Sequence, residues 1–192
     1  MENHVFFLVL LATFMHAVWN GMVKNHPDKA VAVAAIVFGH IPLAIVAIIF
    51  LPTPTINCIP YIVISAIVHQ GYQWYLLSAY QIGDFTKVYP IARGFGPLVV
   101  TLISILVLGL VLKNLIILSI LLICFGIMIL GLLDKESKNF KVLQLSLFTG
   151  FFIGLYSLVD GYGARASQSP IVYMSWSFIL SAALFPIVLR IK

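Results

Sequence analysis

Long apolar runs separated by short polar turns dominate this sequence. Seven runs, each about 20 residues long, follow one another along 192 residues. A helix of that length spans the apolar part of a bilayer, and lipid excludes backbone groups that lack hydrogen bonds. The sequence therefore predicts an all-α polytopic membrane protein with about seven transmembrane helices. We expect these helices over residues 4–23, 30–51, 61–81, 88–112, 115–133, 142–163 and 170–191.

Composition excludes a soluble fold and disorder. Apolar residues make up 62% of the chain and charged residues 9%, against about 25% charged in soluble domains. The seven spans leave roughly 50 residues for loops and tails, so any function must lie inside the helix bundle. A formal charge of +5 then sets orientation and implies no nucleic-acid partner. Cys58 and Cys124 form neither a metal-binding nor a disulfide pattern.

Basic residues favour one side of the membrane. Eight lie in the odd-numbered loops or the C-terminal tail, and two, Lys113 and Arg165, lie on the other side. The positive-inside rule then places the odd-numbered loops in the cytoplasm and the N-terminus outside.

A short internal similarity predicts two repeats. Asn20-Gly21 near the end of the first span aligns with Asp160-Gly161 near the end of the sixth, and the next span starts ten residues later in both. The repeat unit is five helices, so a second copy enters the membrane inverted, as in many secondary transporters. We expect a five-helix repeat over 1–133, a charged linker over 134–141, and the first two helices of an inverted repeat over 142–192.

Arg93 is the main candidate for solute binding. Tyr89, Arg93 and Pro97 lie on one face of the fourth span. Charged groups at membrane depth are costly and usually functional, and a guanidinium binds carboxylates well. The alternative is an arginine that reaches the interface and pairs with Asp84.

Other polar residues extend this candidate pathway. His69 and Gln73 lie one turn apart on the third span beside Tyr72, and His16 and Asn20 share a face of the first span. A cluster of His16, Asn20, His69 and Arg93 is geometrically allowed. Interhelical hydrogen bonding is the alternative role for these side chains.

Asp160 and a stripe of small residues mark the sixth span. A protonatable carboxylate at this depth could couple transport to protons. The alternative, which the sequence favours, is a pair with Arg165 or a helix-end contact. Gly150, Gly154, Ser157 and Gly161 form the stripe, which is typical of a close-packing face for another helix.

Known membrane chemistries find little support here. An intramembrane protease would need a Gly-x-Ser turn or paired aspartates within the spans, and a zinc enzyme would need H-E-x-x-H. The sequence contains none of these. We therefore expect neither intramembrane protease nor zinc-enzyme chemistry. A seven-helix receptor and a structural subunit of a larger membrane complex stay open.

Several motifs resemble the EamA-type branch of the drug/metabolite transporter superfamily. They are His16-Ala-Val-Trp-Asn20 with Lys24, then His69 and Tyr72, then the run from Ala79 to Gly94 with Pro97, and finally Tyr156, Asp160-Gly161, Gly163 and Arg165. The resemblance implies a fold of ten helices in two inverted repeats that moves small metabolites, without catalysis or a bound cofactor.

The chain departs from that pattern. The last three helices are absent, and residues 110–113 lack the glutamate that family members often carry there. The family is commonly drawn with both termini in the cytoplasm, which disagrees with the lysine count. A second copy or another chain would then be expected to complete the pathway.

The resulting prediction is a secondary carrier of small metabolites, such as amino acids, that works by alternating access in a bacterial-type inner membrane. The alternative is a truncated, non-transporting membrane subunit or remnant. The pathway candidates are His16, Asn20, His69, Tyr72, Gln73, Tyr89, Arg93 and Asp160.

Overall fold

The structure, a computed structural model, describes residues 3–132, 139–167 and 169–190, and these form helices without a strand. An all-α fold is therefore confirmed. The helices are α1 (Asn3–Asn25), α2 (Lys29–Gly39), α3 (Ile41–Phe50), the short 3₁₀ helix η1 (Ile56–Cys58), α4 (Ile59–Ile82), α5 (Phe85–Leu106), α6 (Asn114–Leu132), α7 (Phe140–Ala166) and α8 (Pro170–Arg190).

Five helical stretches in the described ranges are long and apolar enough to cross a membrane. They are α1, α2 with α3 taken together, α5, α7 and α8. This is the pattern of a multi-pass membrane protein. The third predicted span is the 24-residue helix α4, in which several polar side chains lower the mean hydropathy. The fifth is α6, whose apolar stretch Asn114–Ile129 is shorter. The count of seven spans stays a prediction.

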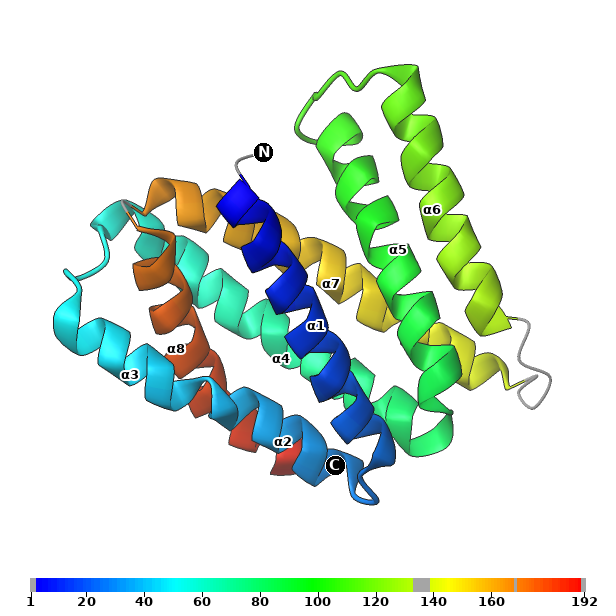
Figure 1. Cartoon of the computed structure of the whole chain (residues 1–192), viewed down its shortest axis with the longest axis horizontal. Helices are drawn as coiled ribbons and strands as arrows, with labels where there is room; N and C mark the ends of the chain where they lie inside the picture. The colour runs from blue at the N-terminus through cyan, green and yellow to red at the C-terminus, as the bar shows by residue number, and fades with distance from the viewer. Residues whose placement is uncertain (1–2, 133–138, 168, 191–192) are drawn as a thin grey trace.

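The second predicted span is one membrane-length stretch with a break in its middle. Helix α2 ends at Gly39 and α3 begins at Ile41. Pro42 lacks the N–H that would bond to the carbonyl of Phe38, so the helical ladder is interrupted there. His40 sits in the break with a helical backbone conformation. The break gives the stretch its irregular shape beside α8 (Figure 1).

Two boundaries predicted from the sequence are wrong. The fourth span was expected to reach Leu112, but α5 ends at Leu106. Gly109 adopts a positive φ of 65°, and the Leu110 N–H bonds to the Ser104 carbonyl at 2.9 Å, so the chain turns there. Residues 134–138 of the predicted linker 134–141 lie outside the described residues, and α7 already begins at Phe140, two residues before the predicted sixth span.

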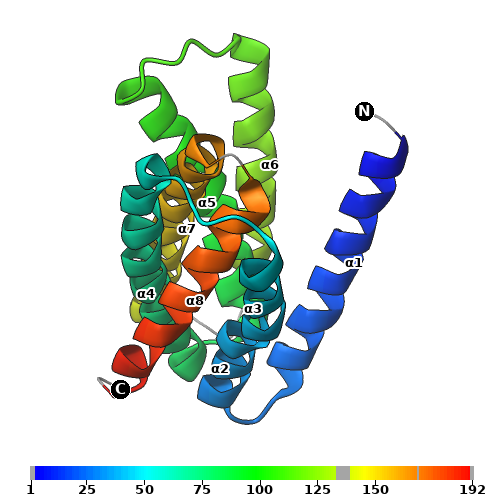
Figure 2. The same ribbon diagram turned by 90° about the vertical axis from the view of Figure 1, so that its left-hand side faces the viewer.

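Helix α7 lies at the centre of the packing. It contacts α4 along one side and α5 along another, while α8 packs on α4 and α3, and α6 pairs with α5 (Figure 1). Helix α1 stands to one side of this bundle (Figure 2). None of the described side chains in its most apolar stretch is buried. Because α1 has few apolar contacts, its position relative to α5 depends heavily on polar contacts.

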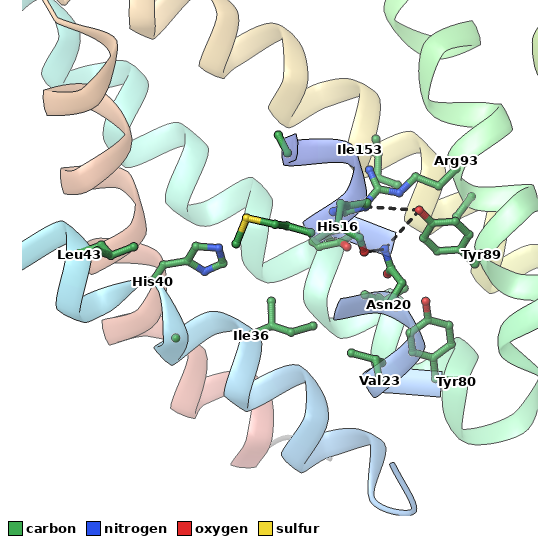
Figure 3. A pocket seen from close by; sticks show the side chains of 16 residues that line it. His16, Asn20, Val23, Ile36, His40, Leu43, Tyr80, Tyr89, Arg93 and Ile153 are labelled. Atoms are coloured by element: carbon green, nitrogen blue, oxygen red, sulfur yellow. Dashed lines mark hydrogen bonds between the residues drawn. The ribbon is translucent and has the colours of Figure 1, made fainter. Parts of the chain in front are cut away.

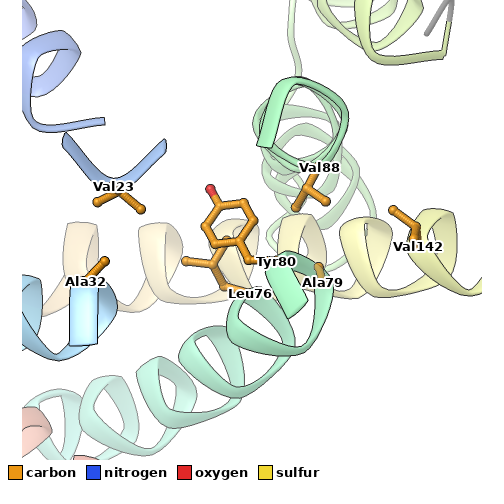
Figure 4. Close-up of a cluster of buried hydrophobic side chains, with 7 residues drawn as sticks. All are labelled: Val23, Ala32, Leu76, Ala79, Tyr80, Val88 and Val142. Carbon is orange, nitrogen blue, oxygen red and sulfur yellow. The ribbon is translucent and has the colours of Figure 1, made fainter. Parts of the chain in front are cut away.

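One buried apolar cluster joins five helices. Its tyrosine, Tyr80, lies between α1 and α5 with only 8% of its surface exposed (Figure 4). The Tyr80 ring also stacks on Phe85, with 5.3 Å between ring centroids. This cluster fixes the end of the bundle at which α1 meets α5. Its members are Val23, Ala32, Leu76, Ala79, Tyr80, Val88 and Val142.

Glycines allow α5 and α7 to touch backbone to backbone. A Cβ atom added at Gly150 would lie 2.7 Å from the Ala92 carbonyl oxygen, and one at Gly154 would lie 2.6 Å from Val99. The predicted close-packing face is thus confirmed at these two positions. At Gly161 a Cβ would meet nothing within 4 Å, so the stripe does not extend that far. The crossing sets the position of Arg93, which is one residue from Ala92.

Candidate functional site

A cavity of about 480 Å³ lies between α1, the α2–α3 break, α4 and α5, with Ile153 of α7 also in its wall (Figure 3). Five of the eight predicted pathway residues line it. They are His16, Asn20, Tyr72, Tyr89 and Arg93. The rest of the wall is mostly apolar, which is typical of a site that orients an organic molecule with few polar contacts.

The polar residues of the cavity bond to one another across α1 and α5. His16 Nε2 lies 3.2 Å from Arg93 Nη2 and 3.3 Å from the Tyr89 hydroxyl. Asn20 Nδ2 donates to the Tyr89 hydroxyl at 3.5 Å and to the His16 carbonyl at 2.7 Å. A guanidinium can only donate, so His16 Nε2 accepts, and the ring is neutral with its proton on Nδ1.

Arg93 keeps its charge without a carboxylate partner among the described residues. It is half-buried, and its Cζ lies 5.4 Å from the centroid of the Tyr89 ring. The expected alternative, a pair with Asp84, is not formed, because Asp84 lies nine residues earlier at the start of α5. An arginine at membrane depth that faces neutral partners can bind an anionic group.

Asp160 belongs to a second polar cluster, at the junction of α4, α7 and α8. Its Oδ1 accepts from Ser65 Oγ at 2.5 Å and from the Tyr173 hydroxyl at 2.9 Å. Its Oδ2 faces His69 Nε2 at 4.0 Å. The His69 ring also stacks on Tyr156, with 4.3 Å between centroids. His69 is therefore grouped with Asp160 and does not line the cavity of Arg93.

Of the two alternatives expected for Asp160, the pair with Arg165 is wrong. Five residues apart on a helix, the two side chains point in different directions. Arg165 instead lies over the Tyr162 ring, 5.9 Å from its centroid. Asp160 turns inward to Ser65 and Tyr173.

Gln73 lies outside both clusters. Its side chain is buried against α8, where Nε2 lies 3.5 Å from Ser181 Oγ. Interhelical hydrogen bonding, the alternative considered for this stretch, describes Gln73 and the neighbouring Gln70, which also bonds to Ser181.

Three residues of the cavity and of the Asp160 cluster are not among the eight pathway residues predicted from the sequence. Tyr80 lines the cavity, while Ser65 and Tyr173 hold Asp160. Tyr80 and Ser65 are polar residues in an apolar span, which is a usable signal. The sequence around Tyr173 does not indicate that it contacts Asp160, because only the packing of α8 on α4 brings the two side chains together.

No family model, curated protein or solved structure matches this chain. The resemblance to EamA-type transporters therefore stays a prediction. Among the described residues, no group of three or more His, Cys, Asp or Glu side chains is arranged to hold a metal ion.

Proposed function

We propose that the protein is a membrane carrier for small organic solutes that bear a carboxylate, with Arg93 as the anion-binding residue. The single observation that carries the proposal is the Arg93 guanidinium, half-buried in a cavity of about 480 Å³ without a carboxylate partner among the described residues. A cavity of this size admits a molecule as large as an amino acid.

The surroundings of Arg93 favour an organic anion over an inorganic one. Apolar side chains such as Met15, Ile36 and Leu43 form much of the wall opposite the polar cluster. A ligand with an apolar body and one carboxylate would place its charge at Arg93 and its body against these side chains. His16 and Tyr89 already bond near the guanidinium and would orient the incoming group.

Transport by alternating access follows from the predicted inverted repeat. Two similar halves of opposite orientation can exchange conformations around a shared site, which opens the site to each side in turn. The EamA resemblance adds support from the motifs around His16 and Arg93. The weak attachment of α1 to the bundle fits a helix that moves when the cavity opens.

Equilibrium binding to the purified protein tests the site. The probes are ¹⁴C-labelled L-phenylalanine and benzoate, with benzylamine as the matched ligand that carries a cation in place of the carboxylate. Hydrogen bonds to a charged group contribute about 1.5–3 kcal/mol, so Arg93→Gln should weaken binding of the carboxylates by about 10- to 150-fold.

Arg165→Gln is the matched control. It removes the same charge from α7 at a position over Tyr162, outside the cavity lining, and should leave binding unchanged. Equal affinity for benzylamine and benzoate, or equal loss in both arginine variants, would contradict the proposal. The second candidate, a non-transporting subunit, would bind none of the probes.

A further inference from the structure

The Asp160 cluster contains a titratable pair that the Arg93 cavity does not use. Asp160 Oδ1 is occupied by two hydroxyl donors, from Ser65 and Tyr173. Its Oδ2 faces the imidazole of His69. The two side chains are only 15% and 18% exposed, respectively. Water therefore does little to stabilise charge on either group.

The tautomer of His69 is fixed by its own helix. His69 Nδ1 lies 2.9 Å from the Ser65 carbonyl oxygen. A carbonyl only accepts, so Nδ1 carries the proton. Nε2 is then the nitrogen that gains or loses a proton, and it is the one that faces Asp160 Oδ2 at 4.0 Å.

The proton content of the pair decides whether it attracts or repels. With one proton bound, as an imidazolium beside a carboxylate or as a carboxylic acid beside a neutral ring, the two groups attract. Without it, a lone pair on Nε2 faces a desolvated carboxylate. Binding forms one N–H or O–H bond, and release returns the same proton to water.

We propose that Asp160 and His69 form a proton-binding site, and that its occupancy couples proton movement to solute movement. The coupling half of this proposal rests on the proposed carrier function. The proton site itself does not, because it follows from the geometry of the pair.

The position of the pair explains how occupancy can act on the bundle. Asp160 lies on α7, Ser65 and His69 on α4, and Tyr173 on α8. Protonation of the pair thus adds an attraction between α4 and α7, whereas the hydroxyl bonds of Ser65 and Tyr173 to Oδ1 do not need that proton. Release of the proton removes this attraction and would allow α7 to move relative to α4, as alternating access requires.

Aromatic rings connect the pair to the cavity. Tyr156 stacks on His69 and makes an edge contact with Tyr72, at 5.4 Å between centroids. Tyr72 lines the cavity of Arg93. A movement of His69 would therefore displace Tyr156 and then Tyr72, which lines the solute cavity.

Few other charges face the pair. Arg165, the cation nearest to Asp160 along α7, lies over the Tyr162 ring and so points away from the pair. Asp160 and His69 are thus the acid and the base that face each other at this junction in the described residues. Two titratable side chains contact the pair directly: Tyr173 of α8 bonds to Asp160, and Tyr156 of α7 stacks on His69. Two more lie one residue further away: Cys58 of η1 packs with Tyr173, and Arg93 of α5 lies within electrostatic range of Tyr156.

Nitrogen NMR of the full chain, with ¹⁵N-labelled histidine in lipid nanodiscs, tests the proton site without any solute. His69→Gln assigns the His69 signals. We expect Nδ1 to stay protonated at every pH and Nε2 to gain a proton on acidification. In Asp160→Asn that Nε2 proton should be missing at a pH where the wild type holds it.

Asn at position 160 still accepts from Ser65 and Tyr173, so the junction keeps its hydrogen bonds. Asp84→Asn makes the same chemical change at the start of α5 and should leave the His69 signals unchanged. A neutral His69 with its proton on Nε2, or identical His69 titration in the wild type and Asp160→Asn, would overturn the proposal.

Proteoliposomes test the coupling, with ¹⁴C-L-phenylalanine as the probe. We expect Asp160→Asn and His69→Gln to lose accumulation driven by a proton gradient while they still exchange internal for external solute. Asp84→Asn should accumulate like the wild type. Accumulation by Asp160→Asn, or accumulation driven by a sodium gradient alone, would overturn the coupling.

The two proposals fail in different ways. Absence of exchange in the wild type would contradict the carrier function, and the NMR result would still decide the proton site. Exchange in the wild type together with unaltered proton-driven accumulation in both variants would overturn the coupling and leave the carrier function standing.

Discussion

Replacing Gly150 by alanine tests the contact that positions Arg93. The new Cβ would lie 2.7 Å from the Ala92 carbonyl oxygen and 2.8 Å from Phe95 Cβ, whereas ordinary contact begins at 3.4 Å. The obstructing atoms belong to the backbone or lie next to it, so rotation of a flexible side chain cannot relieve the overlap. Helices α5 and α7 must therefore move apart at their crossing.

The size of the effect follows from two opposing terms. Overpacking of a tight contact costs about 1–3 kcal/mol. Alanine in place of glycine in a helix returns up to about 1 kcal/mol. We expect Gly150→Ala to lower the free energy of unfolding by about 1–2 kcal/mol. Gly161→Ala adds the same methyl group to α7 where nothing lies within 4 Å, so its effect should be neutral or mildly stabilising.

The assay uses the two cysteines of the protein as reporters. Cys58 and Cys124 are free and almost fully buried, with 0% and 2% exposed. A maleimide dye that fluoresces on reaction with thiols reports unfolding as each cysteine becomes accessible on heating. Gly150→Ala should react at a lower temperature than the wild type, and Gly161→Ala should not. Equal transitions for both variants would refute the packing of α5 on α7.

Three smaller changes test other parts of the structure. Asp28→Ala removes the side chain that accepts from the Ala30 and Val31 N–H groups at the start of α2, and should cost about 0.5–2 kcal/mol in the thiol assay; an unchanged transition would contradict this cap. Gly109→Ala forces a positive φ on a residue with a side chain, and should cost about 1–2 kcal/mol; the same assay reads it, and stabilisation would contradict the turn. Tyr89→Phe removes the hydroxyl that bonds in the solute cavity, and should weaken carboxylate binding by less than Arg93→Gln does; a larger loss in equilibrium binding would place the key contact at Tyr89.

Hydropathy and spacing predict much of the fold and part of the site. Helix positions follow from apolar runs, which depend only on local composition. The cluster of His16, Asn20 and Arg93 follows from the side of the membrane on which the first and fourth spans meet. These features need no knowledge of how helices rotate against one another.

Features that depend on tertiary packing were beyond the sequence. Gln73 and His69 lie four residues apart on α4 and were placed in one pathway, yet Gln73 faces Ser181 and His69 faces Asp160. Helix rotation decides this difference. The partner of Asp160 was mistaken for Arg165, because Tyr173 reaches the carboxylate only through the packing of α8 on α4.

Solute exchange across a membrane tests the central claim most directly. Proteoliposomes that contain the purified protein are loaded with an unlabelled amino-acid mixture, and entry of the same mixture labelled with ¹⁴C is measured. The account predicts exchange by the wild type and Arg165→Gln, and none by Arg93→Gln beyond that of protein-free vesicles. Exchange by Arg93→Gln at the wild-type rate would contradict it.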